Sequence, residues 1–342
     1  MPFSPFFKHI SDYPSDRETG WSEELQGVTH DDNNWFITQR DRLWKMHVTV
    51  DLNGAIDGPD ANRGIFNVPI PPELKAYNHM GDPDHFEGHL FVPVEKIDST
   101  RVASIACFNA ETLGFIGSAL VREQREHASW CAVNPADRFL YSSTFDNNSS
   151  INAYEFTIDA AAFKIKLHHK INLTDRGRSF TLNGIQGGVF SVDNGENFLY
   201  LSSNDDDSRG VHVFRWPDGK RVQTISIPRD FFGAGEEIEG LTFWDLDGGL
   251  APGIRGQLHV LELDNDAVFP PDDVKGFKHY RFIQFPFVAN SNPRCREVHR
   301  SDCRFIDLMK SEHKVGYRSF RKALDDRYDA CHFCIGGKFD RR

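Results

Sequence analysis

The stretch that decides the fold is GEEIEGLTFW, residues 235–244, in which Glu239 lies between Ile238 and Gly240 at the head of an apolar run. A carboxylate in such a position is costly unless it is paired or binds a cation. The same step, an apolar residue followed by Glu or Gln and then Gly, occurs in LQGVTH (25–30), FEGHLF (86–91), IQGGVF (185–190) and IEGLTF (238–243). A fifth, less regular copy is EHASWC (126–131), which the match between CAVNPADRFLYSST and FSVDNGENFLYLSS places in register. The pattern indicates an internal repeat.

The spacing of the repeat predicts a β-propeller. The second positions of the five copies are separated by 61, 40, 59 and 53 residues, and about three further strand-like runs follow each copy. These are the length and content of propeller blades. We therefore expect an all-β, five-bladed propeller in residues 1–290, with the N-terminal PFFKHI supplying the fourth strand of the last blade. The alternatives are a six-bladed ring, with extra strands in residues 30–85, and a β-sandwich with chance repeats.

The repeated second position predicts a ring of polar side chains. The first strand of a blade lines the central channel, so we expect these five residues near the axis at one height: Gln26, Glu87, His127, Gln186 and Glu239. The glycine that follows fits a place where backbones converge. Such a ring either binds a divalent cation, calcium or a transition metal, or forms a polar plug held by hydrogen bonds.

This arrangement resembles the five-bladed families of calcium-activated nucleotidases, arabinanase-type glycosidases and tachylectin-like sugar binders. The resemblance is architectural. It implies an axial calcium in the first case and paired carboxylates acting on a glycosidic bond in the second. The arabinanase group has an Asp in the first blade, where this chain has Gln26, and this departure counts against an ordinary glycosidase.

The axial ring leads to two hypotheses of function. The first is a metal-assisted hydrolase acting on a small molecule or carbohydrate at the axis. In it Glu87, His127 and Glu239 are catalytic, and Gln26, Gln186 and His30 bind the ligand. The second is a non-catalytic propeller that binds a sugar or a protein and uses its axial groups structurally.

Charge and hydropathy limit the partners and the location. The formal net charge of −11 argues against nucleic-acid binding by the whole chain. No apolar run approaches the roughly 20 residues of a membrane span, and the N-terminal segment lacks the pattern of a signal peptide. We expect a cytoplasmic protein in which Cys107 and Cys131 are reduced core residues.

The C-terminal residues 291–342 form a separate, basic module in this interpretation. They carry 13 Lys or Arg against 8 Asp or Glu, which leaves −16 for the rest of the chain and favours docking of the module on the propeller. His299 and Cys303, then Cys331 and Cys334 after a gap of 27 residues, have the spacing of a tetrahedral zinc site. Cys295 is an alternative first ligand.

The stretch CREVHRSDCRFIDLMKSEHKVGYRSFRKALDDRYDACHFC (295–334) resembles the Ada-type metal-binding domain. The similar features are the helix containing Ala-Leu and the closing Cys-x2-Cys. In that family the first zinc-binding cysteine also accepts a methyl group from damaged DNA. Here His299 occupies that position, and an imidazole can bind zinc but cannot act as the thiolate acceptor. The resemblance therefore implies a zinc module of small α/β type without methyl transfer.

Overall fold

The computed structural model describes residues 6–17, 20–97, 99–159, 162–193, 195–227, 236–264, 273–301 and 303–336. The chain divides into two compact units. The first comprises residues 1–3 and 9–281, and the second residues 4–8 and 282–342.

The described strands of the first unit form five sheets. The first contains β2 (Leu25–His30), β3 (Asn34–Gln39), β4 (Arg42–His47) and β5 (Ile65–Pro69). The second contains β6 (His79–Met80), β7 (Asp84–Phe86), β8 (His89–Glu95), β9 (Ser104–Asn109) and β10 (Phe115–Leu120). The third contains β11 (Cys131–Val133), β12 (Leu140–Ser142), β13 (Ser150–Asp159) and β14 (Ala162–Asn172).

Two further sheets complete the first unit as described. The fourth contains β15 (Thr174–Asp175), β16 (Arg178–Ser179), β17 (Gly188–Asp193), β18 (Glu196–Ser203), β19 (Gly210–Trp216) and β20 (Lys220–Ile225). The fifth contains β21 (Glu236–Phe243), β22 (Leu258–Asp264), β23 (Asp273–Phe282) and β1 (Phe7–Arg17). Short 3-10 turns occur at Gly20–Ser22, Ala61–Arg63, Pro72–Leu74 and Arg122–Gln124.

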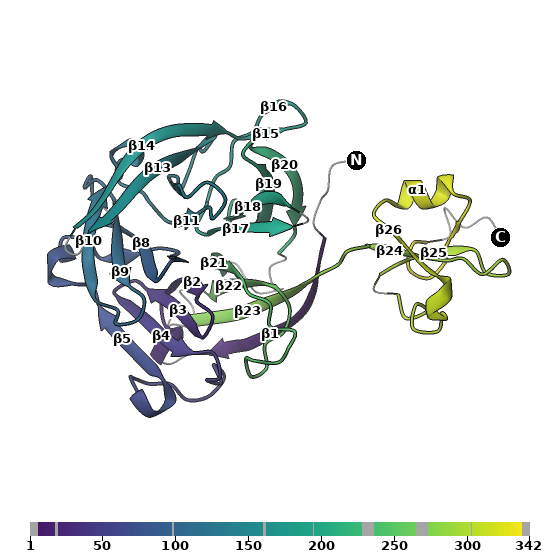
Figure 1. Cartoon of the computed structure of the whole chain (residues 1–342), viewed down its shortest axis with the longest axis horizontal. Helices are drawn as coiled ribbons and strands as arrows, with labels where there is room; N and C mark the ends of the chain where they lie inside the picture. The colour runs from purple at the N-terminus through teal and green to yellow at the C-terminus, as the bar shows by residue number, and fades with distance from the viewer. Residues whose placement is uncertain are drawn as a thin grey trace. The chain divides into compact units, whose positions relative to one another are not determined.

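The sheets surround a common centre, with β2, β11, β17 and β21 nearest to it (Figure 1). Within a sheet, strands that follow one another in the chain mostly pair antiparallel, as β2 with β3 and β3 with β4. The apolar cores lie between neighbouring sheets. One of them joins Trp35 of β3 to Leu261 and Phe277 of the fifth sheet. The all-β propeller predicted from the repeat is confirmed.

The closing strand comes from the N-terminal segment, as the sequence predicted. β1 lies at the edge of the fifth sheet beside β23, so the first and last parts of the propeller share one sheet. Within that sheet His279 lies opposite His259, and its Nε2 is 2.8 Å from the carbonyl oxygen of Tyr13 on β1. The first residue of PFFKHI, Pro5, falls outside the described part of the chain.

Asp82 is the hub of the propeller. Its buried carboxylate accepts hydrogen bonds from the N–H groups of Val28 (3.0 Å), Gly188 (3.0 Å) and Leu241, which belong to three other sheets. Its backbone N–H donates to the carbonyl oxygen of Ser129 (2.8 Å), beside the third sheet. One residue therefore links all five sheets.

Glycine is required beside this hub. A Cβ on Gly27 would lie 2.3 Å from Asp82 Cα, and one on Gly240 would lie 2.5 Å from Asp82 Oδ1. These contacts explain the Gly of the repeated step at positions 27 and 240, since any larger residue would separate the inner strands. The channel is thus closed near its middle, and side chains before and after the hub line two different ends.

The second unit is a small sheet with one helix. It contains β24 (Phe287–Asn290), β25 (Glu297–Arg300), β26 (Lys314–Tyr317), β27 (Asp329–Ala330), α1 (Phe320–Asp325) and a 3-10 turn at Ser311–His313. Ser319 caps α1 by accepting a hydrogen bond from Lys322 N–H. Tyr328, Ala323 and Val298 form its own apolar core.

Candidate functional site

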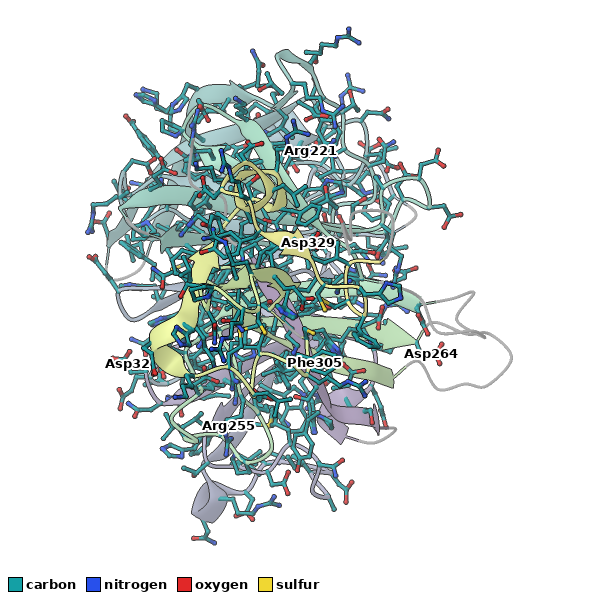
Figure 2. All side chains as sticks on the ribbon, turned by 90° about the vertical axis from the view of Figure 1, so that its right-hand side faces the viewer. Asp32, Arg221, Arg255, Asp264, Phe305 and Asp329 are labelled. Atoms are coloured by element: carbon teal, nitrogen blue, oxygen red, sulfur yellow. The ribbon has the colours of Figure 1, made fainter. Side chains whose placement is uncertain are left out.

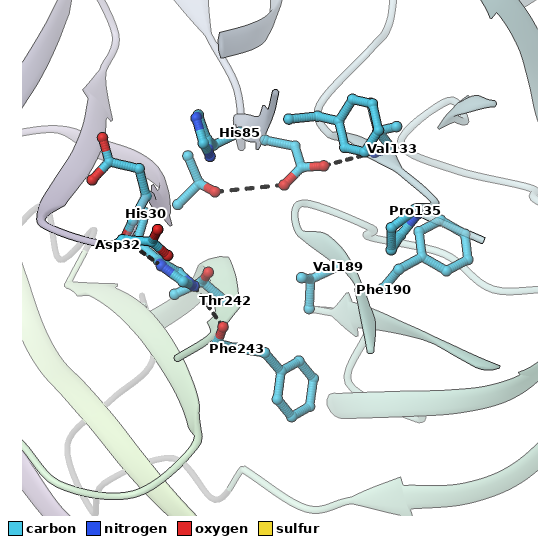
Figure 3. Close-up of a pocket in the computed structure, with 13 residues that line it drawn as sticks. His30, Asp32, His85, Val133, Pro135, Val189, Phe190, Thr242 and Phe243 are labelled. Atoms are coloured by element: carbon cyan, nitrogen blue, oxygen red, sulfur yellow. Dashed lines mark hydrogen bonds between the residues drawn. The ribbon is translucent and has the colours of Figure 1, made fainter. Parts of the chain in front are cut away.

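A cavity of about 300 Å³ lies where the inner strands end, after the hub. One side is polar, with His30 and Asp32 beside β2 and His85 on β7 (Figure 3). The facing side is apolar, with Val133, Pro135, Val189 and Phe190 (Figure 3). A concave site with a few polar groups against an apolar wall is the usual form of a small-molecule pocket.

Asp84 is the most strongly perturbed carboxyl group of this pocket. Burial raises its pKa to about 7, although the N–H of Val133 donates to Oδ2 at 2.7 Å and opposes that shift. The hydroxyl of Thr29 lies 3.5 Å from Oδ1 (Figure 3). A carboxyl group with this pKa exists in both protonation states near neutral pH, so it can donate or accept a proton there.

The other two carboxylates of the pocket differ in their surroundings. Asp31 accepts hydrogen bonds from the N–H groups of Asn33 and Asn34 at 2.7 Å each, so it organises its own loop. Asp32 is exposed at the rim of the pocket. Both carboxylates raise the pKa of His85, whereas burial, the larger effect, lowers it.

His30, which the sequence predicted to bind the ligand, lines the pocket, but its ring nitrogens face the protein. Nδ1 lies 2.8 Å from the carbonyl oxygen of Asp31, and Nε2 lies 2.6 Å from that of Phe243 (Figure 3). The ring also stacks on Trp244 at 4.3 Å. Burial lowers the pKa of His30 and favours the neutral ring, which has one N–H and can donate to one of these two carbonyl oxygens. His30 therefore joins β2 to β21 and offers neither nitrogen to a ligand.

Glu239 and Gln186 meet at the opposite end of the channel. The Nε2 of Gln186 donates to Glu239 Oε1 and to Glu237 Oε2, both at 2.7 Å. The two carboxyl groups are also hydrogen-bonded to each other, which requires a proton between them. Burial raises the pKa of Glu239, and the neighbouring Glu237 raises it further. Glu237 and Asn204 line a second cavity of about 500 Å³.

The axial position predicted for Glu87 is wrong. Glu87 and Gly88 are the two residues of the turn between β7 and β8, with φ angles of 48° and 78°. Such a pair is typical of a tight hairpin, where Gly is favoured for its positive φ. The Glu87 side chain is 56% exposed and binds Arg138 through two hydrogen bonds of 2.6 Å. The Glu-Gly pair of FEGHLF therefore forms a hairpin turn, whereas the Glu-Gly pair of IEGLTF lies within strand β21.

His127 is exposed and is not part of the pair formed by Glu239 and Gln186, and none of the described hydrogen bonds joins Gln26 to that pair. His127 is 52% exposed, and its Nδ1 is 3.6 Å from a carboxylate oxygen of the buried Glu95. Gln26 is buried on β2 before the hub. Of the five predicted ring residues, the described contacts bring Gln186 and Glu239 together.

Asp82, Asp84 and Glu237 were not predicted from the sequence as site residues. The sequence held a signal for the region of the first two. Glu87 lies 61 residues after Gln26 and 40 residues before His127, whereas Asp82 lies 56 residues after Gln26 and 45 residues before His127, which is a more even spacing. Glu237 is two residues before Glu239 on the same strand, and both carboxyl groups accept a hydrogen bond from the amide of Gln186. The dipeptide Glu-Glu was visible, but nothing in the sequence showed that these side chains meet.

The second unit brings together the four predicted metal ligands. The donor atoms of His299, Cys303, Cys331 and Cys334 lie within 4.8 Å of one another. Tetrahedral zinc with Zn–S bonds of about 2.3 Å has ligand separations of roughly 3.8 Å, so a small contraction is enough for binding. Three thiols and one imidazole are a donor set that zinc prefers. The residues fit the ion.

Local structure explains this convergence. β25, which carries His299, pairs in parallel with β27, and Cys331 directly follows that strand. Cys303 lies in a turn in which its own N–H donates to the carbonyl oxygen of Arg300. The N–H of Arg300 donates to Cys334 Sγ at 3.3 Å. Burial and the neighbouring thiols raise the pKa of Cys334 to about 12. A metal ion would displace these thiol protons.

Cys295 is exposed and does not belong to this group, so the alternative first ligand is not supported. Among the described residues, the His299 group is the one cluster of three or more His, Cys, Asp or Glu whose donor atoms converge. The axial cation therefore stays a prediction. In the same described part of the chain, no helix is long and apolar enough to cross a membrane.

No family model and no curated protein sequence matches the chain. Several solved structures are weakly similar. A GH43_1 enzyme from Xanthomonas citri has 10% identity and a TM-score of 0.43, over 78% of this chain and 88% of the enzyme. A GH43 β-xylosidase/α-arabinofuranosidase from a compost microbial metagenome has 10% identity and a TM-score of 0.43, over 87% and 98%.

The β-propeller domain of Cps50 (Swd1) from Myceliophteria thermophila has 11% identity and a TM-score of 0.36, over 71% of this chain and 67% of that domain. The similar structures therefore include a β-xylosidase/α-arabinofuranosidase and a β-propeller domain. At these scores and identities they assign no activity to this chain.

Proposed function

We propose that the propeller is a hydrolase whose active site is the pocket after the hub, with Asp84 as its proton-donating group. The observation that carries the proposal is the enclosure of Asp84 in that pocket, where burial raises its pKa to about 7. Perturbed carboxyl groups in a cleft are candidates for acid–base catalysis. Each of the five sheets is one blade in this interpretation.

The chemistry needs two carboxyl groups with different roles. Protonated Asp84 gives its proton to the oxygen of the leaving group as the bond to that oxygen breaks. Asp32, exposed at the rim, accepts a proton from the attacking water, whose oxygen forms the new bond. After the reaction, Asp32 releases its proton to the solvent and Asp84 takes up a proton from the solvent, so both carboxyl groups return to their starting states.

The walls of the pocket favour a small ligand with polar and apolar faces. The Phe190 and Val189 side can pack against the less polar face of a sugar ring, while hydroxyl groups face Asp32 and His85. A carbohydrate or a similar polyhydroxylated molecule is therefore the proposed substrate class.

The test is hydrolysis of a panel of chromogenic glycosides by the full chain. Asp84→Asn should lower kcat by roughly 10²–10⁴-fold, the usual contribution of a general acid. The wild-type rate should fall as pH rises through about 7, because the proton on Asp84 is lost there. An Asp84→Asn variant with the wild-type rate would contradict the proposal.

A second candidate site is the pair Glu237 and Glu239 at the other end of the channel. The shared proton and the adjacent cavity of about 500 Å³ support it, and a divalent cation can replace that proton. In this version Glu239 is the catalytic carboxyl group and Gln186 orients the ligand. Elemental analysis with Glu239→Gln as the comparison tests for the ion.

We further propose that the second unit binds one structural zinc ion through His299, Cys303, Cys331 and Cys334. All four positions are protein ligands, which is the arrangement of a structural rather than a catalytic zinc site. The full chain should contain one equivalent of zinc, and a Cys331→Ser/Cys334→Ser variant should contain none.

The opposite charges of the two units support a weak docking of the basic module on the acidic propeller. Small-angle scattering at low and high salt tests this. A radius of gyration that increases with salt is expected, and one that is unchanged would contradict docking by charge.

A further inference from the structure

The two nitrogens of the His299 ring face different chemical groups. Nδ1 lies 3.5 Å from Cys303 Sγ, on the side where the three thiols converge. Nε2 lies 3.6 Å from a carboxylate oxygen of Glu297. The ring itself is 4% exposed, so these surroundings fix its orientation.

Backbone pairing explains why the ring is held this way. His299 pairs with Val288 of β24, and the preceding Val298 pairs with Ala330 of β27, so β25 has a neighbour on each side. Glu297 is two residues before His299 on this strand, which places both side chains on one face of the sheet. The strand therefore sets a carboxylate beside the imidazole without help from a loop.

We propose that His299 binds the zinc ion through Nδ1 and that Glu297 is the positioning residue that accepts the Nε2 proton. The proposal rests on the zinc site proposed above and adds the ligand atom and its partner. A carboxylate on the outer N–H of a zinc-binding histidine fixes the tautomer and increases the basicity of the ligand nitrogen. A modest side-chain rotation converts the 3.6 Å approach into a hydrogen bond.

The proposal predicts a specific loss of zinc affinity. Removing such an outer partner usually weakens metal binding by about 10- to 100-fold. Glu297→Gln should therefore weaken zinc binding to the full chain by about 10-fold or more, measured by competition with a chromogenic chelator. Glu312→Gln is the matched control, since Glu312 is exposed in the same unit and lies 4.0 Å from Lys310. Its zinc affinity should equal that of the wild type.

A spectroscopic readout separates positioning from general destabilisation. In ¹⁵N-histidine spectra of the zinc-loaded chain, His299 should show a metal-bound Nδ1 and a protonated Nε2. The His299→Cys variant assigns the signal, because it removes the ring and keeps four zinc ligands. A metal-bound Nε2, or an unchanged affinity in Glu297→Gln, would overturn the inference while leaving the zinc site intact. A wild-type chain without zinc would instead refute the zinc site itself.

Discussion

Replacing Asp82 should destabilise the propeller more than replacing any surface carboxylate. Its carboxylate accepts N–H groups from β2, β17 and β21, which lie in three different sheets. In Asp82→Ala these three donors lose their partner at the closed centre of the channel. An unsatisfied buried donor costs about 1–3 kcal/mol, so the expected loss is roughly 3–9 kcal/mol.

Asp82→Asn provides a milder perturbation in case the alanine variant does not fold. The asparagine keeps one oxygen but turns its amide N–H toward a backbone N–H, because both carboxylate oxygens serve as acceptors. One lost acceptor predicts a destabilisation of about 1–3 kcal/mol. Burial raises the pKa of Asp82, and the N–H donors oppose this shift.

Urea unfolding followed by tryptophan fluorescence measures both effects. The described core contains Trp35 and Trp130, which are fully buried and report on packing between sheets. Asp32→Asn is the control, because Asp32 is exposed and should leave the free energy of unfolding unchanged. The loss of a single hydrogen-bond partner costs at least about 1 kcal/mol. If the free energy of unfolding of Asp82→Ala differs from that of the wild type by less than this amount, Asp82 does not act as the hub.

Three further predictions concern other parts of the chain. Glu87→Gln and Arg138→Ala should leave both stability and activity unchanged, because this ion pair is exposed on a hairpin turn; a loss of activity in either variant would restore Glu87 as a site residue. Burial lowers the pKa of His212 to about 4, so the unfolded chain binds a proton below pH 6.5 that the folded chain does not. Stability should therefore fall as pH decreases from about 6.5 to 4, by at most about 3 kcal/mol from this residue, and His212→Gln should reduce that slope in thermal unfolding. Removing zinc with a strong chelator should increase hydrogen exchange in β25 and β27 and leave β3 and β18 protected; unchanged exchange in β25 would contradict a structural zinc.

The propeller could be predicted from the sequence because its repeat has a physical cause. Gly27 and Gly240 recur since the inner strands approach Asp82 too closely for a Cβ. The metal cluster could be predicted as well, because four ligand residues in two close pairs restrict the chemistry strongly. The closing strand followed from the missing fourth strand at β21–β23.

The candidate site could be predicted only in part. The Glu-Gly step has two structural causes, a close approach at Gly240 and a hairpin at Gly88, and the sequence does not distinguish them. The enclosure of Asp84 depends on Val133 and Thr29 from two other sheets. Such burial is a property of the assembled ring, so no local pattern around Asp84 indicates it.

The most direct measurement compares Asp84→Asn and Glu239→Gln for hydrolysis of whichever glycoside the wild-type chain cleaves. Both variants replace a carboxyl group by an amide of nearly the same shape, and the two residues lie at opposite ends of the closed channel. We expect Asp84→Asn to lower kcat by roughly 10²–10⁴-fold and Glu239→Gln to keep the wild-type value. The reverse result would move the active site to the Glu237 end. Binding without cleavage by the wild-type chain would make the propeller a binding module.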